Sequence, residues 1–365
     1  MIENTYIEKK SLSGFTKRNV DWDEIAMEND RQAYQWETQT ALKISRNDFD
    51  KDKIKSFRAD MQASQRISDF VKSKSNDELL DYYFFAKGEF LTNLGILWIG
   101  KREHRAELMY SPSIQFIKYD ELERKVRKLV WDDYSLNTKE MLVSIWQSIP
   151  EFQEYLEFPD GIFRRNIYHY DESVVRELIV NALVHRPYTT RGDIFINLYN
   201  DRLEIHNPGL LPLGVSPNNI LHTSIQRNPH LSKVFYDLML MEKEGSGYDL
   251  IYQNLLSAGK ELPEIIERDD RVVVVIKKKI INSEIVNDID RIVSKYQLKT
   301  KEIIIIGLIL QFNSLSLNEI SKLINQKIDI IKKDWLKGLI ENNLIFKSSN
   351  GEEIYSVNVS LINQK

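Results

Sequence analysis

Three polar side chains recur every fourth residue in a segment that is otherwise apolar. Glu177, Asn181 and His185 stand in "RELIVNALVHRPY", residues 176–188, where nearly every neighbour is apolar. At about 100° per residue, these side chains fall in one narrow stripe of a helix. A helix that is apolar nearly all round is buried. The sequence therefore predicts a buried helix with a carboxylate, an amide and an imidazole on one side.

A carboxylate and an amide one helical turn apart suit a magnesium–nucleotide site. Such a site needs an oxygen ligand for the metal and a carboxylate that orients or deprotonates a water. Asn181 could supply the first and Glu177 the second. The alternative is a structural role, such as a Glu paired with an Arg in the core. His185 is expected to make a structural hydrogen bond, and His206 and His222 show no metal spacing with it, so no transition-metal site is predicted.

Three later features favour a nucleotide site. The segment "EIHNPG" ends a strand in a tight Asn-Pro-Gly turn, which lets a ligand approach the backbone. In "EGSGYDLI", Gly245 and Gly247 stand where a helix begins, and free amides there, with the helix dipole, favour phosphate. Between them runs a long loop, residues 210–227, and long loops in compact domains are often lids or binding loops.

Four motifs in this order resemble a known family. "ELIVNALVHRPY", "DRLEIHNPGLLP", "SIQRNPHLSKVF" and "EKEGSGYDLI" are similar to the RecG-like helicase C-terminal ATPase domains, a branch of the Bergerat (GHKL-type) ATP-binding fold. The resemblance covers roughly residues 160–280. It implies ATP or ADP as the ligand and Mg²⁺ as the metal. In such proteins an AlbA-type (Schlafen-type) domain usually precedes this domain, and a winged helix often follows it.

The resemblance also implies roles for single residues. Glu177 would orient the attacking water, and Asn181 would ligate Mg²⁺. Asn207 and Gly209 would face the adenine, and Arg227 would sit in the lid near phosphate. The full set of residues implied in nucleotide binding is Asn181, Asn207, Gly209, Arg227, Gly245 and Gly247.

Two positions depart from the family pattern. Asn207 stands where classical members have Asp against the adenine amino group, and Pro187 stands in "HRPY" where relatives commonly have "HRDY". Both changes remove a carboxylate, so we expect weak nucleotide binding and at most slow hydrolysis.

Composition sets the class of protein. The chain has 365 residues, of which 42% are hydrophobic and 28% are charged, and this suits two or three globular domains. A net charge of −4 argues against a protein that coats nucleic acid or membrane non-specifically. The absence of cysteine excludes disulfides and thiolate metal sites. The longest apolar runs are too short to span a bilayer, so a cytoplasmic location is expected.

We predict an α/β protein in four parts. Residues 1–45 are interpreted as an extended arm with one strand, or as the remnant of an AlbA-type domain. Residues 46–159 form a mixed helical and strand linker domain, residues 160–283 an α+β sandwich of the Bergerat type, and residues 284–365 a winged helix-turn-helix with a capping box at Ser316 and Glu319.

Two segments of the linker domain are given specific predictions. "GILWIGKR", residues 95–102, has the spacing of a Walker A loop, but Arg102 replaces the magnesium-binding Ser or Thr. We interpret it as a buried strand, so the chain is not a P-loop helicase motor. Residues 120–158 are predicted to be helical.

The predicted function is that of an ATP-binding, DNA-associated regulatory protein. Nucleotide binding, with slow hydrolysis at most, would alter the lid and the winged helix, and a homodimer is a candidate assembly. The lysines expected to bind double-stranded DNA are Lys327, Lys332, Lys333 and Lys337. Acidic residues are interleaved with them, so protein contact or dimerisation is the alternative role of the tail. The alternative function is a DNA-binding transcription regulator or scaffold with a degenerate, non-hydrolysing nucleotide fold.

Overall fold

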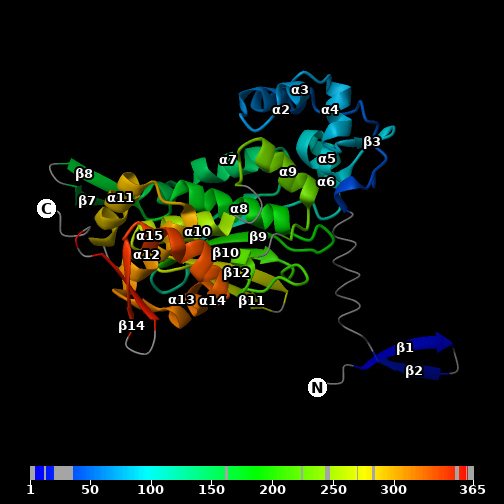
Figure 1. Cartoon of the computed structure of the whole chain (residues 1–365). Helices are drawn as coiled ribbons and strands as arrows, with labels where there is room; N and C mark the ends of the chain where they lie inside the picture. Colours follow the sequence, from blue (N-terminus) through cyan, green and yellow to red (C-terminus); the bar gives the residue numbers. More distant parts are fainter. Residues whose placement is uncertain are drawn as a thin grey trace.

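A six-stranded mixed sheet forms the centre of the computed structural model (Figure 1). The structure describes residues 5–11, 14–19, 36–160, 163–222, 225–242, 247–268, 270–281, 284–349, 353–358 and 360. The strand order is β11-β12-β10-β9-β5-β6. The strands are β5 (Ile114–Tyr119), β6 (Lys125–Trp131), β9 (Ile194–Leu198), β10 (Arg202–Pro208), β11 (Glu264–Arg268) and β12 (Arg271–Lys277). Strands β5 and β9 run parallel, and the other neighbours are antiparallel. The predicted α/β class is confirmed.

The two faces of this sheet differ in polarity. Along β10, Leu203 and Ile205 are buried, whereas Arg202, Glu204 and His206 between them are half-buried and joined to one another by ion pairs. This alternation is the period-2 pattern of a sheet with one core face. Helices α8 (Glu172–His185) and α10 (Gly247–Ser257) lie along the sheet, and α8 contacts both β10 and α10 (Figure 1).

The buried helix predicted from the opening motif is α8. It begins at Asp171, whose carboxylate accepts a hydrogen bond from the amide of Ser173. It ends at His185, because Pro187 follows and disfavours helical backbone at Arg186, which is extended. Nine of its residues are buried, Glu177 among them.

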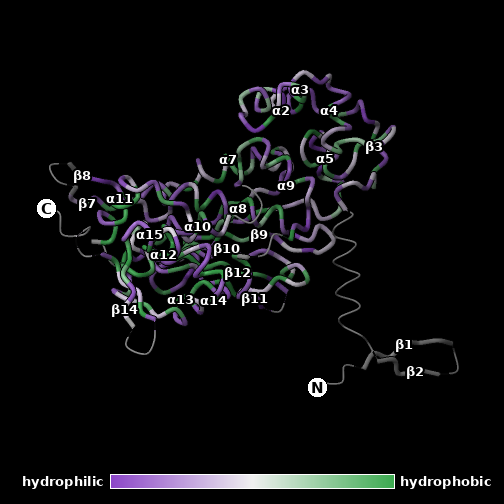
Figure 2. Tube along the Cα trace, in the orientation of Figure 1, coloured by the Kyte–Doolittle hydropathy of each residue, from purple (hydrophilic) through white to green (hydrophobic). Residues whose placement is uncertain are grey.

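Smaller helices pack on the same core. They are η1 (Trp36–Thr38), α2 (Lys51–Ala63), α3 (Asp69–Lys72), α4 (Asn76–Tyr82), α5 (Asn93–Ile99), α6 (Arg102–Glu107), α7 (Thr138–Ser148), η2 (Pro150–Gln153) and α9 (Pro229–Asp237), with the short strands β3 (Ala86–Lys87) and β4 (Phe90–Leu91). One hydrophobic cluster extends from Trp36 to Ile276, so the segments predicted as linker and nucleotide domain share a core and a sheet. Figure 2 shows the hydrophobic stretches gathered inside these layers.

The segment predicted as a buried strand at residues 95–102 is instead mostly helix α5. All seven of its residues are buried, as the apolar run indicated. Thr92 caps it by accepting from the amide of Gly95, and a Cβ on Gly95 would be 1.9 Å from the carbonyl oxygen of Phe85. Because this glycine is packed against backbone inside the core, it cannot open onto a phosphate. The strand prediction was wrong because a short apolar run does not distinguish a buried strand from a buried helix.

The helix predicted over 120–158 is also wrong in part. Residues 125–131 form β6, which pairs with β5 in a hairpin closed at Asp120, whose carboxylate accepts from the amides of Leu122 and Arg124. Only α7 and the turn η2 are helical. Pro150 lacks an amide hydrogen and follows the end of α7 directly, and the chain then forms β7 (Tyr155–Asp160), which pairs with β8 (Phe163–Tyr168).

The predicted arm contains two strands rather than one. Strands β1 (Thr5–Ser11) and β2 (Gly14–Asn19) form an antiparallel hairpin. The last part of the predicted arm packs on the core, because Trp36 is buried and stacks on Tyr188 with ring centroids 4.4 Å apart. Glu37 accepts hydrogen bonds from the amides of His230 and Leu231 at the start of α9.

The tail forms a second hydrophobic cluster, which also includes Leu221 and, from α10, Tyr252 and Leu256. Its elements are α11 (Glu284–Tyr296), α12 (Thr300–Phe312), β13 (Leu315–Ser316), α13 (Leu317–Ile324), α14 (Ile328–Ile330), the π-helical turn η4 (Ile331–Leu336), α15 (Lys337–Glu341), β14 (Ile345–Ser349) and β15 (Glu353–Val357), with strand order β13-β15-β14. The capping box at Ser316 and Glu319 is confirmed. Across the described residues, no helix has the length and apolar character needed to cross a membrane.

Candidate functional site

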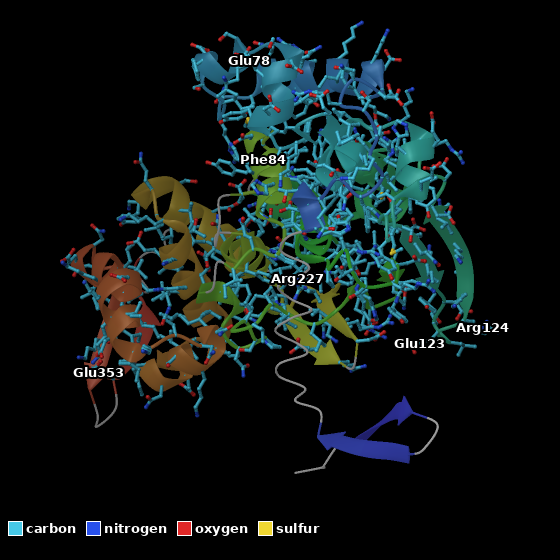
Figure 3. All side chains as sticks on the ribbon, turned by 90° about the vertical axis from the view of Figure 1, so that its right-hand side faces the viewer. Glu78, Phe84, Glu123, Arg124, Arg227 and Glu353 are labelled. Atoms are coloured by element: carbon cyan, nitrogen blue, oxygen red, sulfur yellow. The ribbon has the colours of Figure 1, made fainter. Side chains whose placement is uncertain are left out.

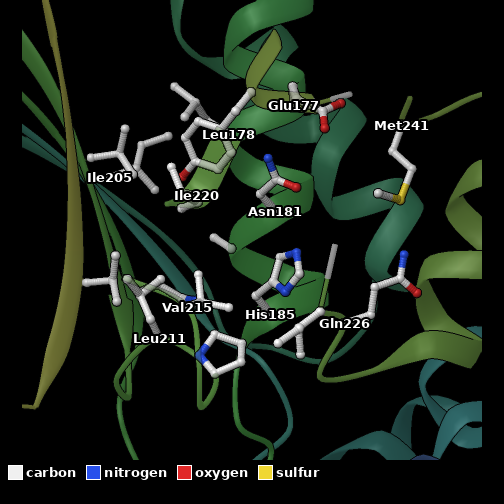
Figure 4. Close-up of a pocket in the computed structure, with 18 of the residues that line it drawn as sticks. Glu177, Leu178, Asn181, His185, Ile205, Leu211, Val215, Ile220, Gln226 and Met241 are labelled. Carbon is white, nitrogen blue, oxygen red and sulfur yellow. The ribbon is translucent and has the colours of Figure 1, made fainter. Parts of the chain in front are cut away.

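One pocket lies between α8, strands β10 and β12, and loop 210–227. It encloses about 1000 Å³ of empty space, counting the part open to solvent. Figure 4 shows Glu177, Asn181 and His185 one after another along α8, all on its pocket side. The stripe inferred from their spacing therefore faces a cavity. Most of the remaining lining is apolar: Leu178, Ala182, Ile205, Leu210, Leu211, Pro212, Val215, Ile220, Ile225, Met241, Val272 and Val274.

Three buried polar atoms of this lining make no well-formed hydrogen bond within the described structure, although Asn181 lies near enough to Glu177 to lower the pKa of its carboxyl group slightly. They are Oε1 of Glu177, Nδ2 of Asn181 and Oδ1 of Asn207. Buried polar groups in proteins are almost always hydrogen-bonded, and leaving one unpaired costs about 1–3 kcal/mol. Three such atoms around one cavity indicate a site that awaits a polar ligand.

Glu177 is the most strongly perturbed carboxyl group of the pocket. Its side chain is 1% exposed, and its Oε2 accepts a hydrogen bond of 3.4 Å from the amide of Glu242. Burial raises the pKa of Glu177 to about 7, against the smaller opposing effect of that amide. A carboxyl group with this pKa can take up or release a proton near neutral pH, as a general base must.

Gly247, at the first position of α10, touches the same carboxylate. A Cβ built on it would be 2.1 Å from Oε1 of Glu177 and 3.5 Å from Nδ2 of Asn181. The absence of a side chain therefore lets the start of α10 approach both residues. Gly245, expected beside it, lies outside the described residues.

Asn207 reaches the pocket from the sheet. In the register of β10 and β12 it stands opposite Val272, and Ile205, two residues earlier, stands opposite Val274. All four line the pocket, because residues two apart on a strand and their cross-strand partners share one face.

Gly209 shapes the turn after β10 rather than lining the pocket. Its φ is +86°, which favours glycine, and its amide donates a 2.7 Å hydrogen bond to the carbonyl of Asp270. A Cβ there would be 2.3 Å from Cγ of Pro187, so the glycine and the proline of "HRPY" are packed against each other.

Arg227, labelled near the centre of the view in Figure 3, is buried and holds backbone. It is 5% exposed, and its Nη1 donates to the carbonyls of His185 at 2.9 Å and Leu210 at 3.0 Å. The next residue, Asn228, donates to the carbonyls of Val184 and Arg186. Together they fasten the end of loop 210–227 to the C-terminal end of α8.

Four residues that the sequence did not assign to the site line the pocket: His185, Gln226, Met241 and Tyr248. His185 was expected to make a structural hydrogen bond; it lines the pocket instead, and within the described residues its ring has no hydrogen-bond partner. The fourfold spacing from Asn181 was the signal that could have assigned it to the pocket. Gln226, Met241 and Tyr248 come from separate segments, and no sequence pattern connects them.

Asn181 is the pocket residue suited to a magnesium ion. Magnesium prefers oxygen ligands and is commonly bound through few protein groups together with substrate phosphates. Among the described residues no group of three or more His, Asp and Glu side chains could hold a metal by itself. The donor set thus fits an ion that arrives with a phosphorylated ligand better than a dedicated metal centre.

The four lysines proposed for DNA contact are exposed on the helical segment 328–341 of the tail, with Lys327 at its N-cap. Two of them have acidic partners: Lys332 Nζ lies 3.1 Å from Glu353, and Lys337 Nζ lies 3.9 Å from Glu341. Glu353, at the outer edge of the molecule in Figure 3, also contacts Lys347, and these lysines lower its pKa to about 2. Part of the expected positive face is therefore neutralised within the domain.

The structure combines an α/β region that encloses a pocket with a mainly helical tail. Residues 192–276 match the family described as "Putative ATP-dependent DNA helicase recG C-terminal". The matched part of the chain, β9 to β12 with the loops that line the pocket, supports the RecG-like C-terminal family of ATPase type that the motifs predicted. Helix α8, with Glu177 and Asn181, lies just before the matched segment.

A solved structure has a similar fold. The chain resembles the DIP2311 protein from Corynebacterium diphtheriae with a TM-score of 0.70 and 16% sequence identity, over 96% of this chain and 70% of that one. At this identity the likeness concerns the fold alone. No curated protein matches the chain.

Proposed function

We propose that the pocket binds an adenine nucleotide with Mg²⁺ and hydrolyses ATP slowly at most. The observation that carries this proposal is the placement of the buried polar groups of Glu177, Asn181 and Asn207 around one largely apolar cavity. A purine is a flat apolar ring with a polar edge, so it needs apolar walls and a few placed hydrogen-bonding groups. The family match of the adjoining segment supports the same ligand.

Each residue then has a chemical role. Asn207 Oδ1 accepts from the amino group of the base, and Asn181 Oδ1 would hold a magnesium ion, which would neutralise phosphate charge. Glu177 takes a proton from the attacking water. Gly247 leaves the start of α10 open, so that its free amides lie near the phosphates. Arg227 fixes the loop rather than contacting phosphate, because its Nη1 is engaged by two carbonyls.

Loop 210–227 offers a route from the pocket to the tail. Ile220 lines the pocket, and its neighbour Leu221 belongs to the hydrophobic cluster of the tail. Asn325, at the end of α13, donates a side-chain hydrogen bond to the carbonyl of Asn218 in the same loop. A loop that closes on nucleotide would therefore displace α13, and this supports nucleotide-dependent regulation of the tail.

The tail is proposed to be a winged helix that binds double-stranded DNA. After α11, the helices α12 and α13, the helical segment 328–341 and the hairpin β14–β15 follow in the order of a winged helix, and four exposed lysines at or on that segment support this role. The pairing of Lys332 with Glu353 favours a second candidate, a scaffold or transcription regulator whose tail contacts protein.

The decisive experiment compares wild type with Glu177→Gln in calorimetric titrations and single-turnover hydrolysis with ATP and Mg²⁺. We expect saturable binding in both proteins and hydrolysis in wild type only, because the variant keeps the shape but loses the base. Absence of nucleotide binding to the folded wild type would refute the proposal. Binding without hydrolysis in wild type would leave the degenerate scaffold as the better description.

A further inference from the structure

His185 and Asn207 lie at the same end of the pocket. Pro187 packs against Gly209, and these two residues stand two positions beyond His185 and Asn207, respectively. Arg227 ties the same chain ends together, because its Nη1 lies 2.9 Å from the carbonyl oxygen of His185 and 3.0 Å from that of Leu210. The end of α8 and the end of β10 are thus held side by side, and both side chains line the cavity.

This end is remote from the carboxylate proposed to act on phosphate. His185 follows Glu177 by eight residues, which is about 12 Å along a helix axis at 1.5 Å per residue. A nucleotide that places its terminal phosphate near Glu177 must extend its base toward the end where His185 and Asn207 meet.

The imidazole of His185 has the chemistry to recognise a base edge. Burial, together with the charge of Arg227, lowers the pKa of His185 to about 4, so the ring is neutral at pH 7. A neutral imidazole offers one donor and one acceptor. Within the described residues the ring has no partner of its own, although it lines the cavity.

We propose that His185 is a specificity-determining residue that, with Asn207, hydrogen-bonds the edge of a bound purine and selects adenine over guanine. The inference rests on the proposed nucleotide site. Adenine presents an amino donor beside ring-nitrogen acceptors, which complements a carbonyl acceptor and an imidazole donor. Guanine presents an oxygen acceptor where adenine has its amino group, and this oxygen would face Oδ1 of Asn207. The apolar walls at Ile205 and Val272 accept the faces of either ring.

The test measures ADP and GDP affinities of the full chain by calorimetry. Loss of one neutral hydrogen bond weakens binding roughly 3- to 10-fold, so His185→Ala should weaken ADP by that factor and leave GDP nearly unchanged. His185→Asn, which keeps a donor and an acceptor, should restore part of the preference. The control is His206→Ala, because His206 directly precedes Asn207, lies on the opposite face of β10 and pairs with Glu204. An equal loss for ADP and GDP in His185→Ala would overturn the inference.

A second measurement on the wild type does not depend on how the variants fold. The ring-nitrogen NMR signal of His185, one of six histidines, should shift when ADP is added and stay in place with pyrophosphate. ADP binding with an unmoved His185 signal would overturn the role of His185 and leave the nucleotide site standing. No ADP binding to the folded wild type would overturn both.

Discussion

Gly247 lies so close to Glu177 that a Cβ on the glycine would be 2.1 Å from the carboxylate oxygen Oε1. At this point, α10 and α8 therefore leave no room for a side chain at position 247. The start of α10 thus limits where the Glu177 carboxylate can lie. Neither the sequence of α8 nor that of α10 reveals this contact by itself.

The first prediction concerns this contact. Gly247→Ala should displace the Glu177 carboxylate and lower ATP hydrolysis about tenfold or more, which corresponds to roughly 1.4 kcal/mol. The free energy of unfolding should change by less than about 1 kcal/mol, since alanine is the better helix former. Single-turnover hydrolysis and urea unfolding check the two parts. Ser257→Ala, at the other end of α10, is the control, and hydrolysis retained in Gly247→Ala would contradict the prediction.

The second prediction concerns the turn after β10. Gly209→Ala combines a φ of +86° with a clash against Pro187 Cγ, so it should destabilise the fold by about 2 kcal/mol or more. The matched control is Gly88→Ala, whose φ is +58° and whose new Cβ would meet nothing within 4 Å. Urea unfolding measures both variants. A second substitution, Pro187→Ala, should recover part of the loss; equal costs for Gly209→Ala and Gly88→Ala would show that the contact is unimportant.

The third prediction concerns pH. The pKa of Glu177 is raised from 4.5 to about 7 in the folded protein, so the folded state binds more protons than the unfolded state between these values. The free energy of unfolding should therefore fall as pH rises through this window, by up to about 3 kcal/mol from this group. Glu177→Gln should be more stable than wild type at pH 8 and similar at pH 5.

The pH experiment has an internal comparison. Glu37 is also buried, with its pKa raised to about 7, so Glu177→Gln should remove only part of the pH dependence. Glu172→Gln, on the exposed first turn of α8, should leave it unchanged. A wild-type stability that rises between pH 5 and pH 8 would contradict the assigned state of both buried carboxyl groups.

The fourth prediction concerns the base edge. Asn207 Oδ1 is buried without a partner in the described structure, and a carboxylate there would accept a charge-assisted bond from an adenine amino group. Such bonds are roughly twice as strong as neutral ones, so Asn207→Asp should tighten ATP several-fold and leave GTP weak. The ligand-free variant should be less stable, because its carboxylate is desolvated. Calorimetry with both nucleotides checks this; unchanged ATP affinity would mean that Asn207 does not face the base.

The fifth prediction separates the roles proposed for the tail. Glu353→Gln releases Lys332 and Lys347, so it should strengthen DNA binding and steepen its dependence on salt by about one to two charges. Replacing Lys332 and Lys333 by Ala should weaken binding to all sequences and flatten that dependence. Fluorescence anisotropy over a salt series measures both. If neither change affects DNA binding, the tail has another partner.

The sequence by itself determined the features that are local. The period of the apolar residues identifies α8, and the fourfold spacing places Glu177, Asn181 and His185 on one side of it. The period-2 alternation identifies β9 and β10, and the capping box at Ser316 follows from the preference of the first helical turn for such pairs. Each depends only on residues within one or two turns of each other, so no tertiary information is needed.

Only the tertiary structure decided the features that depend on distant partners. The run at 95–102 is apolar on every side, which suits a buried strand as well as a buried helix. Only the structure shows that most of it is helical. The strand β6 forms because β5 offers it an edge. Nη1 of Arg227 donates to the carbonyl of His185 at the end of α8, and Gly209 packs against Pro187. Oδ1 of Asn207 is buried in a cavity that several separate segments line. Spacing in a sequence determines which side chains share one face of a helix or strand, whereas the packing of several segments determines which residues or cavity that face contacts.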